Sequence, residues 1–142
     1  MIKKKKNKIG SRTKAQRDFE SMLKHYEPSI LPIPLIVMQY EDCEIITEMF
    51  DIDGIDDIYS LPEFDAMTFL GTTKDGHNNR FVVCAFYGVP NLRIMVHEAC
   101  HAATMYCVAH DIPFGMESDE IHAYLTDWVF TKVYETFNDK NK

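Results

Sequence analysis

The sequence lacks long apolar runs and closely spaced cysteines, and these two absences limit the classes of protein to which it can belong. A membrane-spanning helix needs about 18 consecutive apolar residues, and no segment of the 142 residues approaches that length. The four cysteines show no C-x-x-C spacing, so reduced, buried thiols are expected rather than a disulfide framework. We therefore expect no membrane association and a location in the reducing cytoplasm.

Two regions of the chain each carry charge of only one sign. Residues 1–17 carry eight lysines and arginines and no acid, whereas residues 41–65 carry ten acids and no base. The basic start resembles the first part of a signal peptide, but no apolar stretch follows, so we expect the protein to stay where it is made. Residues 1–12 are predicted to form a basic, flexible tail. Binding of nucleic acid is not favoured, because the acidic body would repel a phosphate backbone.

Residues 13–142 are predicted to form a single α+β domain. Hydrophobic residues make up 46% of the chain, which excludes wholesale disorder and supports a modest core. We expect a short antiparallel sheet packed on two C-terminal helices, with a further helix near the N-terminus. Apolar periodicity and turn residues predict these elements: a helix over 13–26, an extended segment over 31–38, a hairpin of strands 66–72 and 80–87, and helices over 91–110 and from 118 onward.

The acid-rich region 41–65 is predicted to be a solvated loop. Its segment Asp51–Asp57 is rich enough in carboxylates to suggest a calcium loop. However, it lacks the alternating acids, the glycine at the sixth position and the glutamate at the twelfth that such a loop requires. We therefore do not expect a calcium site there.

The segment His97-Glu98-Ala99-Cys100-His101 carries the clearest chemical signal. Residues four apart on a helix lie about 40° apart around its axis, so both imidazoles point the same way and can bind one metal ion. Glu98 lies beside them, where it can accept a proton from a metal-bound water. The helix is predicted to bury Leu92, Met95, Val96, Ala99, Ala103 and Tyr106 and to expose His97, His101, Thr104 and Val108.

Catalytic zinc sites use three protein ligands and leave one position for water, so a third ligand is needed. Glu120 is our first candidate, because the chain turns after residue 110 and a second helix, with Ser118 as N-cap, returns toward the first. It lies on a polar stripe with Tyr124, Asp127 and Thr131. Asp119 replaces it if the helix is rotated. His122 projects roughly opposite Glu120, and His110 is expected to pack or to cap its helix.

The combination of H-E-x-x-H with a glutamate on the following helix resembles the zincin metallopeptidases, in particular their glutamate-ligand branch, the gluzincins. The run Glu120–Leu125 also resembles small metallopeptidase-like proteins encoded by phages and prophages, and the likeness covers about residues 80–137. It implies a small zincin-like fold in which His97, His101 and Glu120 bind Zn²⁺. It also implies that a hairpin strand beside the cleft holds an extended peptide substrate. Many members carry an aspartate four residues after the ligand glutamate, where this chain has Tyr124.

On this interpretation the protein is a zinc-dependent peptidase that acts on a peptide or protein substrate. Glu98 is the general base, and Tyr124 is the candidate donor to the oxyanion, although a tyrosine packed in the core explains it equally well. One alternative is a non-catalytic phage structural or regulatory protein stabilised by zinc. Another is an interaction protein in which the motif is accidental. A phage origin would place the chain in the host cytoplasm or the virion; its oligomeric state is left open.

Overall fold

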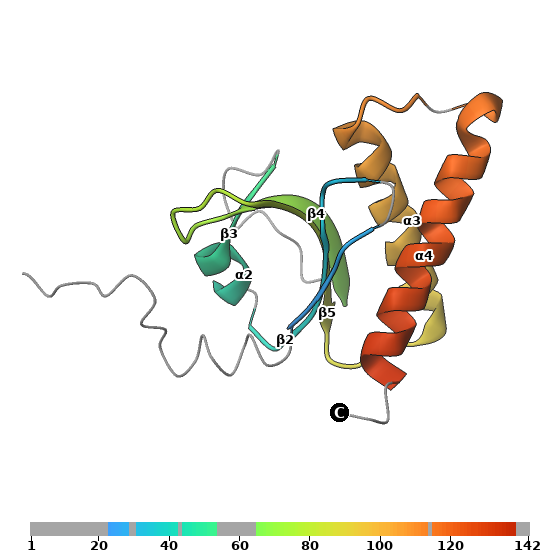
Figure 1. Cartoon of the computed structure of the whole chain (residues 1–142). Helices are drawn as coiled ribbons and strands as arrows, with labels where there is room; N and C mark the ends of the chain where they lie inside the picture. Colours follow the sequence, from blue (N-terminus) through green and yellow to red (C-terminus); the bar gives the residue numbers. More distant parts are fainter. Residues whose placement is uncertain (1–22, 29–30, 43, 54–64, 114, 139–142) are drawn as a thin grey trace, which may run out of the picture.

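The fold is α+β, with helices on both faces of one mixed sheet (Figure 1). The computed structural model describes residues 23–28, 31–42, 44–53, 65–113 and 115–138. The sheet has the strand order β1-β2-β5-β4-β3. The strands are β1 (Leu23–Tyr26), β2 (Leu35–Tyr40), β3 (Phe50–Ile52), β4 (Ala66–Thr73) and β5 (Arg80–Tyr87). The helices are α2 (Glu44–Met49), α3 (Leu92–Ala109), the 3₁₀ turn η2 (Met116–Ser118) and α4 (Asp119–Asn138).

Strands β2 and β5 form the centre of the sheet and are buried on both faces. This explains why both read as nearly continuous apolar runs instead of alternating patterns. They pair in parallel, with Leu35 opposite Val82, whereas every other strand pair is antiparallel. The sheet is therefore mixed, and the prediction of a purely antiparallel sheet was wrong at this pair.

Alternate residues of the central strands enter two separate cores. Val82, Cys84 and Phe86 face α3 and α4, where the larger core lies. Val83 and Ala85 face the smaller core, which is covered by α2. In Figure 1 the two long helices run side by side along one face of the sheet, and α2 lies on the other.

Three sequence predictions for the first half of the chain can be compared with the described residues. Residues 23–26 form strand β1, not the end of a helix, because they pair antiparallel with β2. The predicted acidic loop instead contains α2 and β3 over residues 44–52. Helix α2 forms there because Ile46 packs fully buried in the smaller core. Prolines 32 and 34 precede β2, as expected for the start of a strand.

The predicted tail 1–12, the rest of the predicted N-terminal helix and residues 54–64 lie outside the described residues. The hairpin and both C-terminal helices are confirmed, with boundaries within a residue or two of those predicted. Among the described helices, none has the length and apolar character needed to cross a membrane.

Candidate metal and catalytic site

Helix α3 begins and ends where the sequence predicts. The Asn91 side chain accepts a hydrogen bond from the main-chain N–H of Ile94 at 2.9 Å, which caps the first turn. His110 is the C-cap residue, and its Nδ1 lies 2.8 Å from the carbonyl oxygen of Tyr106. His110 therefore stabilises the helix end and is remote from the histidine pair, which confirms its expected capping role.

The buried face of α3 is rotated slightly from the predicted one. Met95, Ala99, Ala103 and Tyr106 are buried as expected, and Ala102 joins them. Leu92 and Val96 were predicted to be buried but are 57% and 49% exposed, because they lie toward the edge of the helix rather than over the sheet. His97 and His101 are exposed, as predicted.

The two histidines converge on one point. Their Nε2 atoms lie 3.0 Å apart, with the rings nearly perpendicular at 77°. Two imidazole nitrogens bound at about 2.05 Å to a tetrahedral zinc ion lie about 3.3 Å apart. The observed spacing is close to that value and is also the length of a hydrogen bond between the two rings, so it is compatible with two ligand positions of one zinc site.

Glu98 lies about 80° around the helix from the histidine pair, on the side that packs against the sheet, and is only 6% exposed. Its Oε2 accepts a hydrogen bond of 2.5 Å from the Thr68 hydroxyl, and its main-chain carbonyl lies 3.3 Å from the same oxygen. A buried carboxylate without a partner is costly, and this short bond to a charged acceptor offsets part of that cost. Thr68 lies on β4, so the bond joins the sheet to the motif helix.

A buried thiol lies behind this hydrogen bond. Cys84 on β5 is fully buried, and its Sγ lies 3.7 Å from the Thr68 hydroxyl. Burial raises the pKa of Cys84 to about 12; the nearby charge of Glu98 adds to the rise, and the Thr68 hydrogen bond opposes it. The thiol is therefore neutral at physiological pH and does not act as a nucleophile.

A cleft of about 420 Å³ opens where α3 begins beside β4. Both His97 and Glu98 line this cleft, so one histidine of the pair and the carboxylate are reached from one space. The other lining residues are Asp65, Ala66, Asn91, Arg93 and Ile94. Asn91 and Arg93 bring hydrogen-bond donors to the cleft, and Arg93 brings its positive charge.

One edge of β4 borders the same cleft. The Tyr87 N–H donates to the Asp65 carbonyl, and the Thr73 N–H donates to that of Asn79. Because hydrogen-bonded pairs alternate along an antiparallel ladder, the even-numbered residues Ala66 and Thr68 direct their main-chain groups away from β5. Strand β3 and the residues that flank it bond to this edge from Leu70 to Lys74. Within the described ranges, no strand occupies the edge at Ala66 and Thr68.

The structure does not bring Glu120 to the histidine pair. The His122 ring reaches α3, where its Nε2 lies 3.4 Å from the Thr104 hydroxyl. Residues two apart on a helix point about 160° apart, so Glu120 faces away from α3, where it is exposed. Tyr124 also lies on this outer stripe, with 45% exposure, and does not line the cleft.

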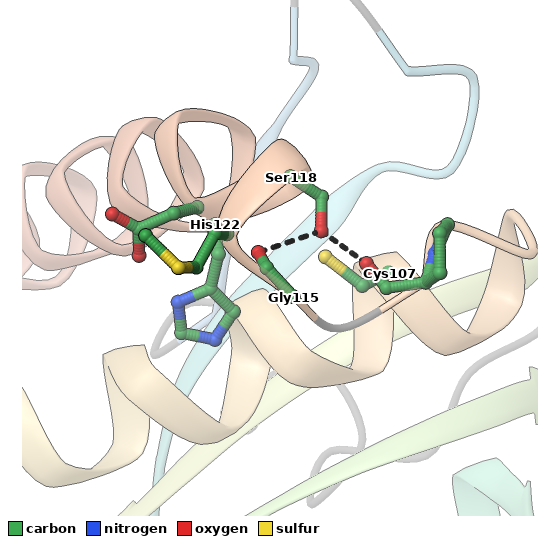
Figure 2. Close-up of a pocket in the computed structure, with 7 residues that line it drawn as sticks. Cys107, Gly115, Ser118 and His122 are labelled. Carbon is green, nitrogen blue, oxygen red and sulfur yellow. Dashed lines mark hydrogen bonds between the residues drawn. The ribbon is translucent and has the colours of Figure 1, made fainter.

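A second pocket, of about 490 Å³, lies beyond the histidine pair, where α3 ends and α4 begins. Figure 2 shows His122 lying over α3 on one side of this pocket, with Ser118, Gly115 and Cys107 on the other. The Ser118 hydroxyl donates to the carbonyl oxygens of Pro113 and Gly115, so it closes the turn instead of accepting a bond as a helix N-cap. Asp119, the alternative third ligand, lines this pocket and not the cleft beside His97.

In the described part of the chain, no three His, Cys, Asp or Glu side chains gather closely enough to hold one metal ion. The two predicted histidine ligands thus lie together, and the predicted base shares a cleft with one of them, while the third ligand and the oxyanion donor lie elsewhere. Sequence reasoning missed Thr68 and Arg93. Arg93 had a readable signal, since it lies one turn before His97, but nothing local to Thr68 indicates that it contacts Glu98.

Comparison with known proteins adds no assignment. No protein-family model matches the sequence, and no curated protein or solved structure is significantly similar to the chain.

Proposed function

We propose that the chain is a zinc-dependent peptidase of the zincin type. The observation that carries the proposal is the convergence of the His97 and His101 Nε2 atoms to 3.0 Å, next to a cleft that Glu98 also lines. A bound zinc ion would lower the pKa of a water molecule and polarise the scissile carbonyl group.

The residues in and around the cleft would supply the metal ligands, the base, the peptide-binding edge and the oxyanion donors. His97 and His101 would hold the metal ion, and Glu98 would accept a proton from the attacking water and return it to the leaving amine. The main-chain groups of Ala66 and Thr68, which point away from β5 and face no strand among the described residues, suit an extended peptide, which would add to the sheet as a further strand. Arg93 and Asn91 are the cleft's donors to a developing oxyanion, in place of Tyr124.

Two arrangements of α4 differ in the residue that would be the third protein ligand. Glu120, the candidate from sequence, becomes a ligand only if the first turns of α4 rotate by nearly half a turn, because His122 now faces α3. Zinc affinity measured for Glu120→Gln and for His122→Gln decides between these arrangements. The substitution that removes a ligand should weaken zinc binding about 100-fold, and the other should leave it unchanged.

The alternative is a protein that binds zinc without catalysis. The burial of Glu98 and its bond to Thr68 favour it, because a carboxylate with that partner also serves packing between α3 and β4. Glu98→Gln separates the two functions, since a structural zinc site does not need a base at this position.

The test begins with the zinc content of the purified chain after dialysis, measured by elemental analysis. We expect about one zinc per chain in the wild type and in the control variant His110→Ala, and none in His97→Ala. Cleavage of a quenched fluorogenic peptide library follows, and Glu98→Gln should lower the rate about 100-fold or more while zinc is retained. Bound zinc with no cleavage would leave only the non-catalytic alternative, and cleavage unchanged in Glu98→Gln would overturn the assignment of Glu98 as the base. A chain that never takes up zinc would exclude both.

A further inference from the structure

We propose that Thr68 is the positioning residue for Glu98, and that it links the strand edge facing the substrate to the catalytic base. The inference rests on the proposed peptidase function and goes beyond it, because Thr68 belongs to neither the H-E-x-x-H motif nor the metal ligands. It depends on the placement of one residue, whose side chain bonds to the carboxylate of the base and whose main chain lies on the edge of β4 that faces away from β5.

The side chain of Thr68 fixes the direction of the Glu98 carboxylate. Thr68 lies on the face of β4 that packs against α3, together with Ala66 and Leu70. Its hydroxyl is 2.5 Å from Glu98 Oε2, and a hydroxyl has a single proton to donate. Oε2 is therefore held against the sheet, and Oε1 is left as the oxygen that accepts a proton from the side of the cleft.

The main chain of Thr68 points to the edge of β4 that no strand of the described residues occupies. Its N–H and C=O belong to the even-numbered set that does not bond to β5. A peptide bound along this edge would therefore pair with the residue that orients the base.

The same contact could be only a device for burying a carboxylate. Two features distinguish a positioning role. A structural contact would affect stability without lowering turnover selectively, and it would not require the hydroxyl specifically for turnover. Thr68→Val keeps the shape of the side chain and removes the hydroxyl, whereas Thr68→Ser keeps the hydroxyl and removes a methyl group.

The experiment compares both variants with the wild-type chain on the fluorogenic peptide that it cleaves fastest. We expect Thr68→Val to lower kcat about 10- to 100-fold, the range typical of groups that orient a catalytic or ligand side chain, with KM changed less than about 2-fold. Thr68→Ser should retain kcat within about 3-fold, and zinc content should be unchanged in both. Thr72→Val is the matched control, a half-buried threonine on the same strand and the same face, and should leave kcat unchanged.

Thermal unfolding of Thr68→Val, Glu98→Ala and the double variant tests the contact without using activity. Non-additive shifts in Tm show that the two side chains interact in solution. If the wild type cleaves the peptide and Thr68→Val cleaves it equally fast, the positioning role is overturned and the peptidase function stands. Additive shifts in Tm would overturn it as well. If the wild type cleaves nothing, the proposed function fails and the positioning role fails with it, whatever the Tm values show.

Discussion

Helices α3 and α4 are similar in length and lie side by side, but they direct their polar residues differently. On α3, Glu98 is buried against β4, and the two exposed histidines converge on one point. On α4, the stripe of Glu120, Tyr124, Asp127 and Thr131 is exposed. The buried side of α4 is almost entirely apolar, apart from Thr136.

This difference shows what helical spacing can and cannot reveal. Spacing identifies which residues share a stripe, and it did so for the polar stripe of α4 and, except at Leu92 and Val96, for the buried stripe of α3. It does not tell which stripe faces a partner when two stripes are comparable. On α4 the apolar stripe occupies the interface, since Leu125, Val129 and Val133 are fully buried, and the polar stripe is left at the surface.

The largest expected effect on stability comes from a substitution on the buried side of α4. Leu125→Ala should lower the free energy of unfolding by about 2–5 kcal/mol, because a fully buried leucine leaves a cavity when truncated. Asp127→Ala, on the exposed stripe, should change it by less than about 0.5 kcal/mol. Urea unfolding measures both. Equal losses in the two variants would mean that α4 is rotated and that its polar stripe faces α3.

The buried thiol of Cys84 should make the stability of the protein fall at alkaline pH. The pKa of Cys84 is raised by burial to about 12 in the folded state, from an ordinary value of 9.0. The folded thiol keeps its proton where the unfolded thiol loses it, so stability is complete below pH 9 and falls as pH rises from 9 toward 12. The expected loss is about 1.4 kcal/mol for each pH unit in that window.

Urea unfolding under reducing conditions at pH 8, 9 and 10 measures this loss. Burial also raises the pKa of Tyr106 and of Cys107, so Cys84→Ala should reduce the alkaline loss without abolishing it. Cys100→Ala, which removes an exposed thiol from α3, is the control and should behave like the wild type. An unchanged pH dependence in Cys84→Ala would show that the thiol is not desolvated.

The smallest expected changes in stability come from removing two tyrosine hydroxyls, one that contacts α4 and one that belongs to α3. The Tyr26 hydroxyl is 2.7 Å from Thr136 Oγ1 of α4, so Tyr26→Phe should lower stability by about 1 kcal/mol. The Tyr106 hydroxyl of α3 is buried and has no hydrogen-bond partner among the described residues. Tyr106→Phe should therefore leave stability unchanged or raise it, and thermal unfolding compares the two. A loss in Tyr106→Phe as large as that in Tyr26→Phe would reveal a partner for this hydroxyl.

Local features of the fold were predictable, and contacts between distant segments were not. The hairpin and α3 follow from turn residues, from the Asn91 cap and from periodicity, all of which act within a few residues. The parallel pairing of β2 with β5 joins segments that are far apart in the sequence, and no local signal specifies it. Strand β1 is short and gains its stability from pairing with β2, so periodicity alone favoured a helix there.

The candidate site shows the same difference between local features, which were predictable, and contacts between distant segments, which were not. Spacing within α3 gave His97, Glu98 and His101 as neighbours and placed the histidines on the exposed face correctly. The contact of Glu98 with Thr68 depends on how α3 packs across β4. The third ligand depended on the rotation of a second helix, which four or five apolar side chains decide together. Roles that follow from one helix were therefore accessible, whereas roles that need two elements required the structure.

The single parallel strand pair also has a kinetic consequence. Strands β4 and β5 and helix α3 follow one another along the chain, so they can associate by closing only short loops. Strand β2 reaches its place beside β5 only when the chain that carries α2, β3 and β4 has closed into a large loop. The entropy of that closure must be overcome before the central pairing contributes any stability. The rate of folding is therefore set by the arrival of β2, and the region that carries the candidate site can become ordered before the sheet is complete.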